Sequence, residues 1–490
     1  MFTVIRQFLK RVRLYEWIAF VTGFVLMAFE LAASRILAPT IGTSIYVWTS
    51  VIGVMIAALA IGYACGGWLA DHRGVKQDVG WLLLIASLSI ITTCLFYDPV
   101  LASAVAVTHD PRLQGVIASA ILFAPASFVM GTISPYLAKL RVRSLGTTGR
   151  SVATLSALNS LGGISGTFSA GFIFFNYIGS RETLALLAAI VLACSWQCMA
   201  AARHWRIRTT LTVFLCSAIA LQFAGVTQAG TVASIDTPTS HYKVVDLQQM
   251  FGTLRVLIMG PGGYQSGVYT NGPKELAFDY THKIADVVAA APQKDRILIL
   301  GGGAFTLPEY FGRMYPNSQI DVVEIDPQLP AIAKKYFRYE PTANIHTISQ
   351  DGRTYVRDTQ HMYDVVIVDA YNDSSVPFSM ATREFASSLA RIVRPGGIVT
   401  ANLIASANAD CMPLLSGIHS SYTAAFSHAA LYPLTDANIT AVQNIITLYS
   451  NSPLRWAENI PGASQTNITG SQKLTDNFAP TERLVQQCGA

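Results

Sequence analysis

The sequence predicts two parts of different fold class: a multi-pass α-helical transmembrane domain, followed by an α/β doubly wound domain that begins with a small β-hairpin module. Three observations predict this division. The chain is 51% hydrophobic and 13% charged, with a mean hydropathy of +0.39, which is too apolar for an ordinary soluble protein. The long apolar stretches all lie before residue 230, and from residue 296 onward short apolar runs alternate with helix-like segments.

The changes in composition set the expected boundaries. We expect a transmembrane helical domain at residues 1–230 and a linker with the β-hairpin module at 231–292. A doubly wound domain should follow at 293–460, and a polar, loosely ordered tail at 461–490.

Seven stretches of the first part are long enough to cross a bilayer, which takes about 20 apolar residues. They are residues 17–38, 46–70, 80–97, 115–138, 151–178, 183–202 and 209–229. Their many glycines, alanines and serines are typical of helices that pack closely in lipid. The sequence therefore predicts the lipid bilayer as a partner of residues 1–230.

Charge indicates how these spans are oriented. Residues 1–230 hold 16 Lys and Arg against 7 Asp and Glu, whereas residues 231–490 hold 18 against 22. The basic residues concentrate before the first span and after the second, fourth and sixth, which predicts a cytoplasmic N-terminus. We interpret the excess positive charge as a topology signal and expect no nucleic-acid partner.

The side of the membrane on which residues 231–490 lie stays open. Seven crossings from a cytoplasmic N-terminus would place these residues outside the cytoplasm, whereas nucleotide chemistry favours the cytosol. Either the span count is wrong by one, or the second part faces outward.

Two ionisable residues lie in or near the first span, Glu30 and Arg35. Such groups are costly in a bilayer and are usually paired or functional. They could form a structural salt bridge, with Arg35 reaching the interface, or they could line a substrate or lipid-headgroup site. Both interpretations remain open.

Cys411 and Cys488 are the cysteines of the second part and show no metal-ligand spacing, so we expect no metal. A disulfide between them would require an oxidising compartment.

The hairpin module is predicted from two alternating runs, residues 241–247 and 253–259, and a helix should follow at 275–291. Strands are then expected at residues 296–300, 319–325, 343–348, 364–369 and 397–403, with an antiparallel pair near 429–432 and 444–449. A sheet of this kind binds ligands at the carboxyl ends of its strands.

Candidate ligand groups recur at those strand ends. Gly301, Gly302 and Gly303 form a turn between a strand and a helix, where a nucleotide can approach the backbone. Glu324 ends the next strand, where a carboxylate can hold ribose hydroxyls. The remaining groups at strand ends are Asp351, Gly352, Asp369, Asn372 and Asp373. Together they predict a nucleoside-binding site.

These motifs resemble the spermidine synthase family, the polyamine aminopropyltransferases, and in particular its bacterial members that are fused to a membrane domain. The resemblance covers nearly all of residues 236–405, and it implies a methyltransferase-like Rossmann domain, a bacterial inner membrane location and a homodimer. It implies S-adenosylmethionine or its decarboxylated form as substrate, with an amine as acceptor. By position it assigns catalytic roles to Asp369, Tyr242 and Tyr280, nucleoside contacts to Gln265, Glu324, Asp351 and the glycine turn, and contacts to the donor tail or acceptor to His282, Asn372 and Asp373.

The sequence departs from the family pattern at positions that bear on the substrate. The family's glycine turn continues with an aspartate that is similar to a clamp for the donor's ammonium group, and here that residue is Ala304. A second aspartate expected three residues after Asp369 is Asn372, with Asp373 one step later.

Three functions are therefore considered. The first is alkyl transfer of the aminopropyl type to an amine, with release of 5′-methylthioadenosine and with Asp369 as the base. The second is cleavage or cyclisation of S-adenosylmethionine without an acceptor, a lyase activity suggested by the missing carboxylates. The third is a transporter or sensor that is regulated by a nucleoside-binding domain.

Overall fold

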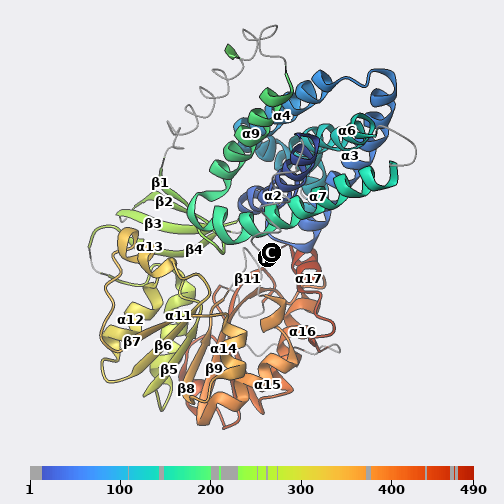
Figure 1. Ribbon diagram of the computed structural model, residues 1–490. Coiled ribbons are helices and arrows are strands. Elements are labelled where there is room, and N and C mark those ends of the chain that lie inside the picture. The colour runs from blue at the N-terminus through green and yellow to red at the C-terminus, as the bar shows by residue number, and fades with distance from the viewer. Residues whose placement is uncertain are drawn as a thin grey trace. The chain divides into compact units, whose positions relative to one another are not determined.

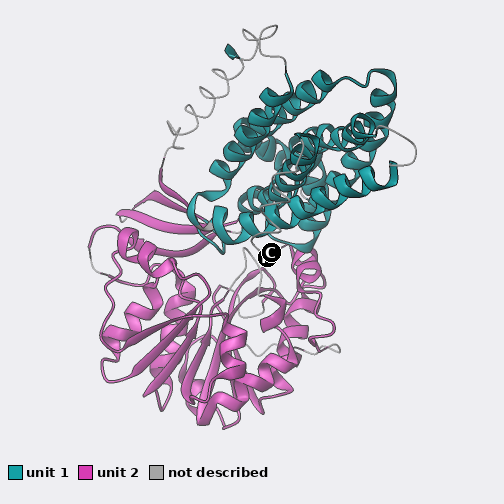
Figure 2. Cartoon of the chain, in the orientation of Figure 1, with its two compact units in different colours: residues 1–228, 236–241 teal, residues 229–235, 242–490 magenta. Residues whose placement is uncertain are grey.

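The computed structural model divides the chain into two compact units (Figure 2). Unit 1 contains residues 1–228 and 236–241, and unit 2 contains residues 229–235 and 242–490. The structure describes residues 14–108, 110–142, 148–199, 209–210, 230–250, 252–260, 263–272, 274–370, 377–435, 439–463, 468 and 473–489.

Unit 1 is helical. Its described helices are α2 (Leu14–Ile41), α3 (Ile45–His72), α4 (Lys76–Val107), α5 (Pro111–Leu122), α6 (Ala124–Arg141), α7 (Thr148–Ser169), η2 (Ala170–Phe174), α8 (Phe175–Tyr177) and α9 (Gly179–Cys198) (Figure 1).

Within the described residues, four helices are long and apolar enough to cross a membrane: α2, α3, α4 and α9. The pair α5 and α6, bent by 54°, would make a fifth. The predicted count of seven is not reproduced there. The stretch 151–178 is divided among α7, η2 and α8, and the glycines and serines of α7 lower its hydropathy. The stretch 209–229 falls outside the described residues except for 209–210.

Small residues allow the helices of unit 1 to touch along their backbones. A Cβ atom added to Gly162 would lie 1.9 Å from the carbonyl oxygen of Phe20, and one added to Gly62 would lie 2.2 Å from that of Phe128. Only glycine fits at such distances. These glycines therefore allow α7 to pack on α2, and α3 on α6, as expected for helices that associate in lipid.

The first sheet of unit 2 contains more strands than a hairpin. Its order is β1 (Thr231–Asp236), β2 (His241–Gln249), β3 (Gly252–Met259) and β4 (Tyr264–Tyr269). The predicted hairpin is the antiparallel pair β2–β3, and β4 continues it on the other side of β3. The linker expected at the start of residues 231–292 is wrong for residues 231–236, because these form β1.

The second sheet has seven strands in the order β10-β11-β9-β8-β5-β6-β7. Its strands are β5 (Arg296–Leu300), β6 (Gln319–Glu324), β7 (Ile345–Ser349), β8 (Tyr363–Val368), β9 (Val393–Ala405), β10 (His428–Pro433) and β11 (Gln443–Ser450). The five strands from β5 to β9 run parallel to one another. At one edge, β11 pairs antiparallel with β9, and β10 pairs antiparallel with β11. This confirms a Rossmann-like, doubly wound arrangement.

Alternation along the strands explains why both faces of this sheet are covered. In β5, Ile297 and Ile299 face one core and Leu298 and Leu300 face the other, since successive side chains point to opposite faces. The first core also contains side chains of α11 (Asp279–Ala290), α12 (Thr306–Met314) and α13 (Leu329–Tyr336). The second contains side chains of α14 (Gly352–Asp358), α15 (Arg383–Ile392), α16 (Met412–Thr423) and α17 (Thr481–Cys488).

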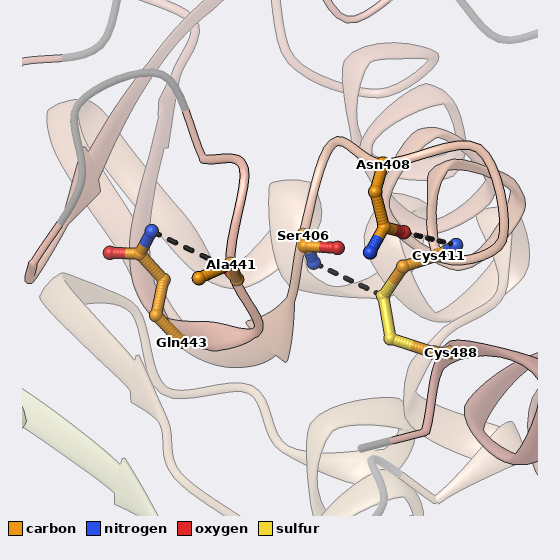
Figure 3. The surroundings of a disulfide bond; sticks show 6 residues. All are labelled: Ser406, Asn408, Cys411, Ala441, Gln443 and Cys488. Atoms are coloured by element: carbon orange, nitrogen blue, oxygen red, sulfur yellow. Dashed lines mark hydrogen bonds between the residues drawn. A yellow bond between two sulfur atoms is a disulfide. The ribbon is translucent and has the colours of Figure 1, made fainter.

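Helix α17 corrects the expectation of a loosely ordered tail. Leu484, Val485 and Cys488 are buried in the second core, and Cys488 is joined to Cys411 by a disulfide (Figure 3). Most residues of this short helix are polar, so its apolar side was not evident from the sequence.

Candidate functional site

The glycine turn joins β5 to α12 and is held by close packing. Gly301 has φ of +99°, and a Cβ atom there would lie 2.4 Å from the carbonyl oxygen of Asp369. Gly303 has φ of +51°, and its Cβ atom would lie 2.4 Å from Oγ of Ser266. Both residues must therefore be glycine, and the turn is pressed between the end of β8 and strand β4.

The second residue after the turn, Phe305, has a left-handed backbone conformation. Phe305 has φ of +60°, and its fully buried ring packs on Tyr339 with a centroid distance of 4.9 Å. Such a conformation is costly for a bulky residue and persists where packing enforces it. The core contact of Phe305 thus fixes where α12 begins.

Glu324 lies at the end of β6, directly beside the turn. Its Oε2 accepts a hydrogen bond of 2.7 Å from the amide of Gly302, and its Oε1 accepts one of 2.9 Å from the amide of Asp326. Burial raises the pKa of this carboxyl group, and the hydrogen bonds from the amides partly offset that effect. A carboxylate can accept several hydrogen bonds, so a side chain at this position could also accept hydroxyl donors from a ribose.

Asp351 and Gly352 lie at the start of α14, beyond the end of β7. Oδ1 of Asp351 accepts a hydrogen bond of 2.8 Å from the amide of Thr354 and so caps the helix. A Cβ atom on Gly352 would lie 2.9 Å from the end of the Met380 side chain. The capping role uses one carboxylate oxygen and leaves the other for a ligand.

Asp369 follows β8 and is the centre of a small polar network. Tyr280 Oη lies 3.4 Å from Asp369 Oδ2 and 3.3 Å from the carbonyl oxygen of Gln265, and its single O–H can donate to either acceptor. Asn402 Nδ2 donates to Asp369 Oδ1 at 3.3 Å, and Asn444 Nδ2 donates to Asn402 Oδ1 at 3.0 Å. The carboxylate is therefore oriented from α11 on one side and from β9 and β11 on the other.

The surroundings of Asp369 change its acidity. Desolvation by the atoms packed around it raises its pKa to about 6, although the hydrogen bonds from Asn402 and Tyr280 act in the opposite direction. The residue nevertheless keeps a partly exposed surface. A carboxylate with a pKa close to neutral and an open side can accept a proton from a substrate.

Other predicted residues have different surroundings. Tyr242 is buried in the core of unit 2 with Val244 and Leu257. His282 Nε2 donates to the carbonyl of Leu276 at 2.9 Å, a local contact at the start of α11. The structure thus brings together Tyr280, Asp369 and the backbone of Gln265, and gives His282 a structural contact. Asn372 and Asp373 lie outside the described residues.

The candidate membrane site at Glu30 and Arg35 belongs to unit 1. Arg35 donates to the carbonyls of Thr237 and Pro238, and its guanidinium lies 4.8 Å from the ring centroid of Phe175. These contacts give Arg35 a structural role in holding residues 237–238.

Three site residues escaped sequence reasoning: Ser266, Asn402 and Asn444. Ser266 Oγ accepts a hydrogen bond of 3.1 Å from the amide of Ala304, at the position where the family aspartate is missing. The signal for Asn402 was an amide inside an otherwise apolar strand, because such a buried polar group needs a partner.

Known proteins resemble the second unit. Residues 277–430 match the sequence model of the Spermine/spermidine synthase domain. A polyamine aminopropyltransferase of Vibrio vulnificus (strain CMCP6) is 32% identical over 26% of this chain and 44% of its own length. A probable polyamine aminopropyl transferase of Bifidobacterium longum (strain NCC 2705) is 35% identical over 24% of this chain and 25% of its own length. The matches therefore span less than half of either relative.

A methyltransferase is also similar. Putrescine N-methyltransferase 2 of Nicotiana attenuata is 33% identical over 25% of this chain and 34% of its own length. Among solved structures, a probable spermidine synthase from Corynebacterium glutamicum ATCC 13032 is 23% identical with a TM-score of 0.43, over 52% of this chain and 99% of that one. Residues 236–276, for which the sequence also suggested a resemblance, precede the matched range. The comparisons thus show similarity to the spermine/spermidine synthase domain over residues 277–430 of this chain.

Proposed function

We propose that unit 2 transfers an alkyl group of the aminopropyl type from an adenosyl sulfonium donor to an amine. The donor would be S-adenosylmethionine or its decarboxylated form, and 5′-methylthioadenosine would leave. The observation that carries this proposal is the Asp369 carboxylate, which is held by Tyr280 and Asn402 beside the glycine turn and has a pKa raised to about 6. The names of the curated relatives support the same reaction class.

The nucleoside half of the donor fits the groups around the turn. Glu324 offers buried carboxylate oxygens beside Gly302, where ribose hydroxyls can donate. The free oxygen of Asp351 can accept from the adenine amino group, since the other oxygen caps α14. The packed glycines bring the backbone close enough to contact the sugar.

The chemical step needs alignment and a proton acceptor. The amine nitrogen attacks the carbon attached to the sulfonium, a C–N bond forms, and the C–S bond breaks with its electron pair moving to sulfur. The sulfonium becomes a neutral thioether, so the leaving group is good. The new ammonium then loses a proton to Asp369, and the hydrogen bonds from Tyr280 and Asn402 keep that carboxylate in place.

A second candidate is cyclisation of S-adenosylmethionine without an external amine. The observation that favours it is Ala304, which is buried and whose amide is bonded to Ser266, so no carboxylate is present there for a donor ammonium. In this reaction the donor's own carboxylate oxygen attacks the carbon next to sulfur. The C–S bond breaks, a lactone forms, and 5′-methylthioadenosine leaves.

Product analysis tests both candidates. The purified full-length protein is incubated with each donor, with and without putrescine, and the products are identified by mass spectrometry. Methylthioadenosine together with an aminopropylated amine, formed only when both substrates are present, supports the transferase. Methylthioadenosine without an acceptor supports the lyase, and S-adenosylhomocysteine with a methylated amine would replace both by methyl transfer.

A sensor or transporter predicts a different outcome. It would bind the donor without turnover in any of these mixtures. The matched control is Asp369→Asn, which should abolish product formation while the donor still binds. Binding by both proteins with turnover by neither would reject an enzymatic function.

A further inference from the structure

The two ends of the helical unit can be told apart by their contacts. One end, which we call the basic end, gathers the start of α2, the end of α3, the start of α4 and the end of α6. Three ion pairs connect these points: Glu16–Arg141 at 3.0 Å, Asp71–Lys139 at 2.6 Å and Asp78–Arg73 at 3.4 Å.

The opposite end, which we call the distal end, has its own contacts. Arg181 at the start of α9 pairs with Asp98 of α4 at 2.9 Å, and Arg112 of α5 lies 4.3 Å from the ring centroid of Tyr46 in α3. Arg35, late in α2, lies near Phe175 at this same end. It is separated from Glu16 by 19 residues of one helix, or about 28 Å at 1.5 Å per residue.

The two ends differ in their basic residues. Thirteen of the 16 Lys and Arg in residues 1–230 lie at the basic end or in the segments that adjoin it in the sequence, and three lie at the distal end. The thirteen are Arg6, Lys10, Arg11, Arg13, Arg73, Lys76, Lys139, Arg141, Arg143, Arg150, Arg203, Arg206 and Arg208. If unit 1 spans a membrane, this asymmetry puts the basic end in the cytoplasm.

The short segment that lies between the two stretches of unit 2 in the chain is bound to the distal end. Residues 236–241 belong to unit 1, where Asp236 accepts a hydrogen bond of 2.9 Å from the amide of Ser180. Arg35 donates to the carbonyl of Pro238 at 3.0 Å and to that of Thr237. Residues 236–241, which unit 2 precedes and follows in the chain, therefore lie at the distal end, and this conclusion needs no count of spans between residues 199 and 230.

The disulfide also indicates the compartment of unit 2, independently of the contacts of residues 236–241. Cys411 is fully buried and Cys488 nearly so, their Cα atoms are 4.1 Å apart, and Figure 3 shows the bond between their sulfur atoms beside Ser406. Disulfides persist in extracytoplasmic compartments and are rare in the cytosol, where thiols are kept reduced. The contacts of residues 236–241 and the disulfide involve different residues and different kinds of interaction, so each supports the same side of the membrane separately.

We infer that unit 2 works on the extracytoplasmic side of the membrane, and that a transport step must supply its donor. The second clause rests on the proposed function, because an adenosyl sulfonium carries a permanent charge and does not cross a bilayer unaided. The donor is produced in the cytoplasm, where its precursors are. A carrier for charged nucleosides must therefore move it across the membrane before this enzyme can use it. The product methylthioadenosine and the alkylated amine are then released outside the cytoplasm.

Thiol accessibility in cells tests the topology without any assay of activity. In the full chain, the five cysteines of residues 1–230 are replaced by alanine, and Cys411 and Cys488 are kept. Single cysteines are then introduced on exposed residues, with Lys334→Cys in unit 2, Thr43→Cys at the distal end and Lys76→Cys at the basic end. A maleimide that cannot cross membranes is added to spheroplasts before or after lysis.

The expected result is that Lys334→Cys and Thr43→Cys react in intact spheroplasts, and Lys76→Cys reacts only after lysis. Labelling of Lys334→Cys only after lysis would overturn the inference. Should a variant accumulate poorly, trypsin added to spheroplasts with the unaltered protein answers the same question, because unit 2 must be digested if it faces outward and protected if it does not.

The disulfide provides a second readout in the same cells. In the chain that keeps Cys411 and Cys488 as its only cysteines, both should resist a mass-tagged maleimide after acid trapping until a reductant is added, and Cys411→Ser in that chain should expose one reactive thiol. Two reactive thiols in the untreated protein would contradict the inference. Failure of the proposed function would instead appear as correct topology with no turnover on either donor.

Discussion

Asn402 donates a hydrogen bond of 3.3 Å from Nδ2 to Oδ1 of Asp369 and accepts one of 3.0 Å on Oδ1 from Asn444. The amide of Asn402 is thereby held in one orientation, with its NH₂ group toward the carboxylate. A donor in that position favours the ionised form of Asp369 and partly opposes the burial that raises the pKa. Asn402 is a positioning residue in this arrangement, because it acts through Asp369.

Replacement of Asn402 by alanine should lower kcat and change the pH dependence of the reaction. Without the amide donor the pKa of Asp369 rises further above about 6, so the acidic limb of the kcat/KM profile should move to higher pH. We expect kcat at neutral pH to fall about tenfold, the loss that corresponds to one hydrogen bond of about 1.4 kcal/mol to a charged group. The pH profile from pH 5 to 9 is the measurement.

Asn444→Ala is the matched control for that variant, because it leaves the bond from Asn402 to Asp369 in place. Its acidic limb should shift less than that of Asn402→Ala. Equal losses of rate without a shift in either profile would show that Asn402 is merely structural.

Asp369 itself should set the pH at which the enzyme becomes active. The base must be ionised, so activity should rise as the pH increases through about 6. Asp369→Asn should remove this limb and lower kcat by about 10²- to 10⁴-fold, the usual contribution of a general base. Retention of most activity by this variant would exclude Asp369 as the base.

The same carboxylate should affect stability with a defined sign. Its pKa in the folded chain lies above the ordinary value of 3.8, so folding favours the protonated form. The stabilisation from Asp369 is complete below pH 3.8 and is lost as the pH rises through about 6. Asp369→Asn should therefore raise the melting temperature of unit 2 relative to the unaltered protein at pH 8 but not at pH 4, which thermal unfolding at the two pH values measures.

The position of the missing aspartate can be tested by restoring it. Ala304 is buried beside the glycine turn, and its amide is bonded to Ser266. In Ala304→Asp a carboxylate could pair with the ammonium of a decarboxylated donor, and we expect its KM to fall about tenfold, as for a charge-assisted hydrogen bond. Initial rates with each donor measure the effect.

Ala304→Asn controls for size, because it has the same shape and no charge. The two variants should differ in KM for the decarboxylated donor and agree for adenosine-containing inhibitors without an ammonium group. A KM that is the same in Asp and Asn variants would show that the donor tail lies elsewhere.

The main sheet was predictable because its strands are short apolar runs between turns. Residues 296–300 agree with β5 to the residue, and the expected antiparallel pair at the edge became β10 and β11. The places of Glu324 and Asp369 were predictable because polar residues there end apolar strands. These signals are local, so a single sequence contains them.

Features that depend on distant contacts were harder to predict. Asn402 lies within a strand, and its role depends on Asp369, which is 33 residues away in the chain. Strand β4 was missed because its sequence, Tyr264 to Tyr269, contains glycine and serine, which are poor strand formers when judged alone. Helix α17 is stabilised by the core and by the bond to Cys411, so its polar sequence did not indicate order.

The disulfide should account for much of the stability of this last helix. Cys411 and Cys488 are separated by 77 residues, and closing a loop of that length stabilises a protein by about 4 kcal/mol in the chain-entropy description. We expect the double variant Cys411→Ser and Cys488→Ser to lose an amount of this order in the free energy of unfolding, and added reductant to lower the melting temperature of the unaltered protein toward that of the variant. Denaturant unfolding followed by tryptophan fluorescence measures both.

Cys65→Ser is the control, since this thiol is free and exposed, and it should leave the transition unchanged. If the double variant unfolds like the unaltered protein, packing alone holds α17 in the core.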